Sequence, residues 1–185
     1  LSTDTFQGAR SLQSVVANEG LETLAGEVQN DRRRRRQVTA PFAHGALGRL
    51  RLPSTLLRLG DAALAGCERL REVRLPEGLE RVGWLWFHRS EVEFVQIPKS
   101  VTAIAYSAFR DCARLARVEF AADSRLTEIE RSAFRGSGLK EVAIPAGVRR
   151  LQSCAFRDCG SLRRVHFAEN AMLTHVESAA FLNAG

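Results

Sequence analysis

The chain has 185 residues and a formal net charge of +6 at pH 7. Its length suits a single domain. Its longest apolar run, Val82 to Phe87, is far shorter than the roughly 18 residues that cross a bilayer, so we expect no integral membrane segment. The positive charge suggests nucleic-acid binding as a hypothesis, which depends on where in the chain the charge lies.

The N-terminal part of the chain contains an insertion. A set of apolar positions opens at Leu12 and is interrupted between the aliphatic Leu24 and the aromatic Phe42. Later sets place the corresponding two residues only five positions apart, as at Ile104 and Phe109. We therefore predict a basic loop insertion at about residues 25–38.

This insertion holds a run of five consecutive cations, which are Arg32, Arg33, Arg34, Arg35 and Arg36. With Glu27 and Asp31 they give the insertion about half of the chain's excess positive charge, and the remainder of the chain is close to balanced. A disordered, solvated loop is the plainer interpretation. Docking of an anion, a nucleic acid or an acidic partner is the alternative. Nucleic acid is not the partner that we expect.

From Leu47 onward one phrase recurs about every 23 residues: Leu-x-x-Val-x-(Leu/Ile/Phe)-Pro-x-x-(Val/Leu)-x-x-(Ile/Leu)-x-x-x-Ala-Phe. A fixed period of this size is typical of a solenoid, whose stacked coils share one core. In Leu70-x-x-Val73-x-Leu75 the alternation of apolar and polar positions predicts a short strand with one buried face. Pro76 follows and closes the strand, because proline has no N–H to donate.

The second half of each coil places a small residue beside a large aromatic one, as at Ala108 and Phe109. This spacing predicts a short helical turn on the wall opposite the strands. In two coils Ala121 and Ala168 replace the proline, and two extra residues follow before the next aliphatic. Those two coils should bulge locally.

The repeats make residues 1–185 a single solenoid. A partial coil around Leu1 and Phe6 and a coil opening at Leu12 precede the six that open at Leu47, Leu70, Val92, Leu115, Leu139 and Leu162, which gives about seven coils. The chain starts and stops in mid-coil, without the polar capping repeats that solenoids need. These ends predict a piece of a longer array, or neighbouring subunits packed on the uncapped ends.

The columns resemble those of the BspA-like leucine-rich repeat, in which cysteine, proline and Ala-Phe columns recur together. The resemblance runs from about Leu47 to Phe181 without a break. It implies an α/β repeat solenoid, a leucine-rich-repeat array with parallel strands on the concave face and short helical turns opposite. It also implies a role in adhesion or protein binding, often at cell surfaces. It carries over no substrate, catalytic residue or cofactor.

Residues that could support catalysis or metal binding are scattered. Cys67, Cys112 and Cys159 share one column, where buried structural thiols are the expected interpretation. A metal site that uses Cys154 and Cys159 would lack a second ligand pair. The four histidines, His44, His88, His166 and His175, lie in separate coils. We expect no enzyme activity and no cofactor or metal site.

One candidate binding surface is the exposed face of the strands. The register turns Phe94 and Gln96 outward, and it predicts Arg74 and Arg117 on the adjacent coils as neighbours of Phe94. An aromatic residue among arginines is a typical anchor of protein interfaces. A single exposed apolar side chain of no consequence is the alternative.

A second candidate surface lies in the second halves of neighbouring coils. Trp84 and Tyr106 share a column that is small or polar elsewhere, and Trp86 replaces the small residue of an Ala-Phe pair. Three large aromatics here predict a docking patch. Alternatively, Trp86 only fills a gap left by the shortened coil that opens at Val92.

These features favour a non-catalytic binding module, for adhesion or as a scaffold, that presents a curved wall to a protein partner. The alternative is a structural subunit built permanently into a larger assembly. A weaker alternative is anion or nucleic-acid binding through the arginine run. The module would be secreted or on the cell surface by the resemblance, and the subunit would belong to an intracellular or organellar assembly.

Overall fold

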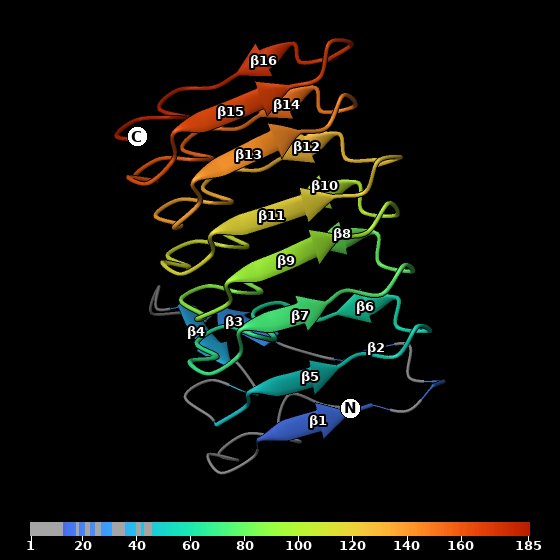
Figure 1. Ribbon diagram of the computed structural model, residues 1–185. Coiled ribbons are helices and arrows are strands. Elements are labelled where there is room, and N and C mark those ends of the chain that lie inside the picture. Colours follow the sequence, from blue (N-terminus) through green and yellow to red (C-terminus); the bar gives the residue numbers. More distant parts are fainter. Residues whose placement is uncertain are drawn as a thin grey trace.

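The computed structural model describes residues 13–17, 19–20, 42 and 46–185, together with the backbone of strands at 23–24, 27–30 and 36–39. Parallel strands stack into a solenoid that rises from the N-terminal to the C-terminal end (Figure 1). Each coil crosses two walls, which we call the front wall and the back wall. The expected parallel-strand solenoid is confirmed.

The front wall carries the longer strand of each coil. Its strands are β1 (Ser14–Val16), β5 (Arg49–Arg51), β7 (Glu72–Arg74), β9 (Phe94–Ile97), β11 (Arg117–Phe120), β13 (Glu141–Ile144) and β15 (Arg164–Phe167). They form three parallel ladders, β1 with β5, β7 with β9 and β11, and β13 with β15.

The back wall carries two-residue strands. They are β2 (Thr23–Leu24), β6 (Arg58–Leu59), β8 (Arg81–Val82), β10 (Ala103–Ile104), β12 (Glu128–Ile129), β14 (Arg150–Leu151) and β16 (His175–Val176). Strands β8 to β16 form one continuous parallel ladder, and β2 pairs with β6.

The expected helical turns are not found, since the described residues contain no helix. After β10, N–H groups alternate between two kinds of partner. Ala108 donates to Ala105 O within the coil (3.1 Å), whereas Phe109 donates to Ala133 O of the next coil (2.7 Å). Left-handed residues such as Ser107 (φ 54°) turn every second N–H out of the coil. A helix would keep all of these bonds inside one coil, so the helical turns of the α/β prediction are not confirmed on this wall.

Two other expectations about the array stay predictions. The partial coil at Leu1 and Phe6 lies outside the described residues, so the count of about seven coils is untested. The concave curvature of the strand wall is untested as well. The insertion at 25–38 contains an antiparallel pair, β3 (Glu27–Asn30) and β4 (Arg36–Thr39), rather than only the predicted loop. Arg32 to Arg35 lie outside the described residues.

A single hydrophobic core runs along the solenoid between the two walls. Its most regular feature is a stack of phenylalanine rings, one from each coil: Phe87, Phe109, Phe134, Phe156 and Phe181. Successive ring centroids lie 4.9 to 5.3 Å apart, and the ring planes are within 5° of parallel. Each ring is therefore packed by its neighbours in the adjacent coils.

The cysteine column is structural, as predicted. Cys67, Cys112 and Cys159 are buried free thiols. Cys112 Sγ donates to Phe87 O (2.8 Å), and Cys159 Sγ donates to Phe134 O (3.0 Å). Burial raises the pKa of Cys67 and of Cys112 to about 12, so both thiols stay protonated. Each acts as a small core side chain that also satisfies a buried carbonyl.

Candidate binding surfaces

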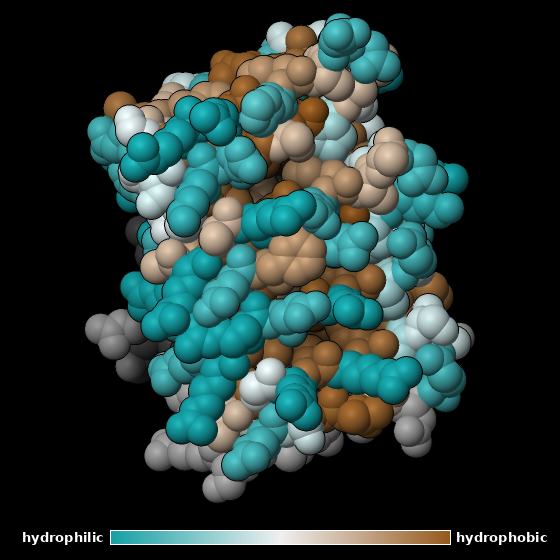
Figure 2. Space-filling model, in the orientation of Figure 1, coloured by the Kyte–Doolittle hydropathy of each residue, from teal (hydrophilic) through white to brown (hydrophobic). Residues whose placement is uncertain are grey.

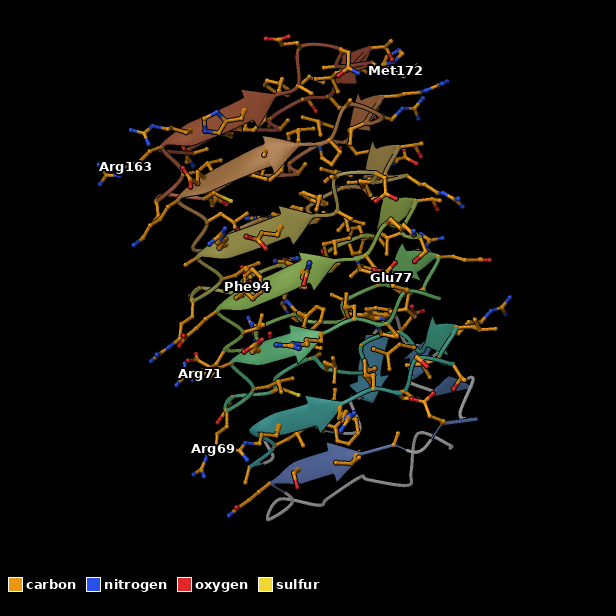
Figure 3. The ribbon with its side chains drawn as sticks, turned by 45° about the vertical axis from the view of Figure 1, so that its right-hand side comes forward. Arg69, Arg71, Glu77, Phe94, Arg163 and Met172 are labelled. Carbon is orange, nitrogen blue, oxygen red and sulfur yellow. The ribbon has the colours of Figure 1, made fainter. Side chains whose placement is uncertain are left out.

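Phe94 lies on the front wall at the start of β9 (Figure 3). Its side chain is half-buried rather than fully exposed. The ladder places Glu72 of β7 and Arg117 of β11 directly beside it. Arg74 instead lies beside Gln96, two residues further along the strand. The prediction that two arginines flank Phe94 therefore holds for Arg117 and was wrong for Arg74, because a parallel ladder aligns residues at the same position of each coil.

The two arginines near Phe94 already have acidic partners. Arg117 pairs with Glu119 in its own strand, and Arg74 Nε lies 3.6 Å from Glu72 Oε1. Both arginines are more than half exposed, so these pairs add little to stability. Figure 2 shows this wall, with hydrophilic side chains over most of it and hydrophobic surface between them.

A groove of about 790 Å³ opens over β11, β13 and β15, and we call it the front groove. Its lining includes Glu119 and Ala121 on one side, Ala143 and Ala146 on the floor, and His166 and Ala168 on the other side. A short loop that begins with Pro145 follows β13 and leads to Val148. The coils on either side carry the loops with two extra residues, and these form the banks.

The signal for the front groove was present in the sequence. Ala121 and Ala168 mark the two longer loops, and Ala143 is the only small residue in its strand position among the six coils from Leu47. The two positions were recognised as bulges. That a shorter coil lies between them, and that a groove results, was missed.

The back wall carries a second groove of about 760 Å³, which we call the back groove. In later coils a polar side chain accepts a hydrogen bond from the preceding coil, as from Tyr106 N–H to Glu130 Oε2 (2.9 Å). The same column holds Gly60, Gly83 and Ala105 in the earlier coils, and these three line the back groove. The absence of long side chains at these positions opens the hollow.

All three predicted aromatic residues line the back groove, and two of them, Trp84 and Tyr106, are partly exposed there. Trp84 and Tyr106 make an edge-to-face contact with ring centroids 5.7 Å apart, and both are half-buried. Arg81 reaches across two coils to Glu130, with Nη2 2.7 Å from Oε1. The groove therefore offers aromatic surface next to an ion pair.

Trp86, which was grouped with these aromatics, is a core residue. Its side chain is 1% exposed, and Nε1 donates to Leu59 O (3.1 Å). The indole lies over Gly83, where a Cβ would come within 2.2 Å of Nε1. Glycine at position 83 thus makes the room that the indole fills. Trp86 therefore fills space in the core, but that space is at Gly83, and the predicted gap at the shortened coil that opens at Val92 stays untested.

The fold perturbs the titration of His88, which lies in the turn after the phenylalanine column. Burial lowers the pKa of its imidazole, and a hydrogen bond between Nδ1 and Arg110 O (3.0 Å) together with the nearby Asp111 carboxylate opposes this shift in part. The fold therefore favours the neutral imidazole of His88 over the protonated one. Among the described residues, no three His, Cys, Asp or Glu side chains are grouped so as to hold a metal ion.

The C-terminal end of the stack exposes apolar side chains. Met172 is 50% exposed and Val176 is 54% exposed, at the end of the array (Figure 3). Neighbouring subunits on the ends of the array stay a prediction. Within the part of the chain that is described, no helix is long and apolar enough to cross a membrane.

Stacked parallel coils with proline, Ala-Phe and cysteine columns define a leucine-rich repeat protein. The family described as "BspA type Leucine rich repeat region" matches the chain in six copies over residues 39–163 and 86–184. The chain belongs to this family. Its members are repeat proteins whose fold is suited to protein binding or adhesion. No curated protein sequence is similar to the chain at a significant level.

A solved structure of a bacterial leucine-rich repeat protein shares the fold. A leucine-rich repeat protein from Bacteroides ovatus is 21% identical with a TM-score of 0.56, over 95% of this chain and 45% of that one. The pneumococcal vaccine antigen PcpA is 22% identical with a TM-score of 0.49, over 63% of this chain and 28% of its own. The chain thus spans less than half the length of either structure.

Proposed function

We propose that this chain is a non-catalytic module that binds a protein partner through its front wall. The observation that carries the proposal is the front groove, a hollow of about 790 Å³ whose lining includes Arg117, the ladder neighbour of the half-buried Phe94. Aromatic anchors beside pockets supply much of the binding energy of protein interfaces. The wall needs no rearrangement to present them, since its strands are fixed by ladders and a continuous core.

Two substitutions on the front wall test this function. Phe94→Ala should weaken binding of a partner from the native source by about 1–2 kcal/mol. Ala143→Arg should weaken it too, because the long side chain would fill the groove floor. Both should leave stability almost unchanged, since Ala143 is exposed and Phe94 lies outside the core cluster. Binding that survives both substitutions would refute the proposal.

The back groove favours a second candidate, a structural subunit held in a larger assembly. Its aromatic pair, Trp84 and Tyr106, lies beside a hollow of similar volume on the opposite wall. Trp84→Ser separates the two candidates. Partners that are lost with Trp84→Ser and kept with Phe94→Ala would assign docking to the back wall.

A further inference from the structure

A third hollow, of about 350 Å³, lies on the front wall where strands β11, β13 and β15 begin. We call it the basic pocket. Its lining consists of two neighbouring positions from each of three coils: Ala116, Arg117, Lys140, Glu141, Arg163 and Arg164. Four of these side chains are cations and one is a carboxylate. We propose that the basic pocket takes an acidic side chain of an extended protein segment lying in the front groove.

The column that lies just before the front strands shows why this pocket is unusual. In its N-terminal part, Arg71 Nη1 lies 3.1 Å from Glu93 Oε1 of the next coil, and Arg114 also pairs with Glu91 and Glu93. Charges of opposite sign thus lie against each other there. Ala116 follows Glu93 in the column and has no polar group, so its small side chain leaves space.

Beyond Ala116 the column continues with two cations. Arg163 N–H donates to Lys140 O (2.8 Å), which places the two residues on adjacent coils about 4.8 Å apart. Both side chains are exposed, and neither forms a salt bridge within the described residues. Like charges so close together repel, and a bound carboxylate would relieve the repulsion. Arg163 lies at the edge of the wall where β15 begins (Figure 3).

The basic pocket and the front groove adjoin, because they share two lining residues. Arg117 and Glu141 line both of them, the pocket at the start of the strands and the groove over the strands and the loops that follow. A segment that lies along the groove can therefore place one end in the pocket. This inference rests on the proposed function, since it assumes that the groove holds a protein segment.

The groove favours a protein segment over a uniformly charged polymer. Its lining includes the small or apolar Ala143, Ile144 and Pro145, and the charged residues Arg117, Glu119 and Glu141 leave it no excess of positive charge. A sulfated polysaccharide or a nucleic acid, whose charge repeats along the chain, would find no row of cations along the groove beyond the pocket. A peptide with a carboxylate at one end and apolar or neutral residues behind it matches this distribution.

Selection of random linear peptides displayed on phage against the intact protein tests the proposal. The enriched peptides should carry Asp or Glu toward one end. A fluorescent synthetic copy should bind about tenfold more weakly to the variant Lys140→Gln, Arg163→Gln and Arg164→Gln, because exposed ion pairs each contribute modestly. Substitution by Gln avoids placing a new carboxylate opposite Glu141.

The matched control removes three exposed arginines that line neither hollow: Arg125→Gln, Arg131→Gln and Arg149→Gln. It changes the net charge equally and should bind the peptide as the unmodified protein does. Equal weakening in both triple variants would mean a general charge effect and would overturn the inference. Retention of heparin that depends on the basic pocket, with no acidic peptide enriched, would overturn it as well.

The outcomes also separate this inference from the proposed function. If enriched peptides lack acidic residues but lose binding with Phe94→Ala or Ala143→Arg, the front wall binds protein and the role of the basic pocket is refuted. If no peptide is enriched, or if enriched peptides ignore all of these substitutions, both proposals fail. Circular dichroism of every variant establishes that the fold is kept.

Discussion

The phenylalanine stack leads to a prediction about how stability is distributed along the array. Phe109 is fully buried, and its ring lies 4.9 Å from that of Phe87 and 5.0 Å from that of Phe134. Phe109→Ala would remove both ring contacts and leave a cavity between the front and back walls. We expect the free energy of unfolding to fall by about 3–5 kcal/mol, as for other buried Phe truncations.

Phe181 occupies the same column at the end of the stack. Its ring stacks on that of Phe156, at 5.3 Å, and its side chain is only partly buried. Phe181→Ala should therefore lower the free energy of unfolding by only about 1–2 kcal/mol. Urea unfolding of both variants, followed by circular dichroism, measures the difference. Equal losses would refute the idea that each coil is stabilised mainly by its neighbours.

Three further predictions concern other parts of the fold. Deleting residues 25–38 should leave the solenoid folded, because the surplus residues lie outside the repeated columns. Unfolding of this variant would show that the register of the first coils is wrong. Loss of heparin retention in the folded variant would assign anion binding to the arginine run. Gly83→Ala should lower the free energy of unfolding by about 1–3 kcal/mol because its Cβ would clash with the Trp86 indole, and chemical denaturation should give a much smaller loss when Trp86 is already Ala. The free energy of unfolding should decrease as the pH is lowered below about 6.5, the ordinary pKa of histidine, because the unfolded imidazole of His88 takes up a proton more readily than the buried one. Urea unfolding at several pH values should show a weaker dependence of this free energy on pH for His88→Gln. An unchanged dependence would contradict the assignment.

The sequence was sufficient for the fold family and for the main columns. A period of about 23 residues requires each coil to bury its apolar set against the next, so parallel stacking follows from the pattern alone. The outward positions of Phe94 and Gln96 also follow, because the strand register alternates faces. The buried cysteine column follows from its recurrence at one position of the coil. The helical turns could not be excluded in this way. Whether an N–H bonds within its own coil or to the next depends on how the coils stack.

The surfaces depend on the tertiary structure. Whether Trp86 belongs to a docking patch or fills a gap could be decided only from the indole packed over Gly83. Glu72 and Arg117 are the neighbours of Phe94 because parallel ladders align the same position of successive coils. The grooves arise from differences in side-chain length and loop length between adjacent coils. The column of Lys140 and Arg163 can be read along the chain, but only stacking places those charges together beside the space that Ala116 leaves. The repeated positions of the sequence thus determine the core. The positions that depart from the repeat form grooves and charged sites only when the coils are stacked, because each such site combines residues of several coils.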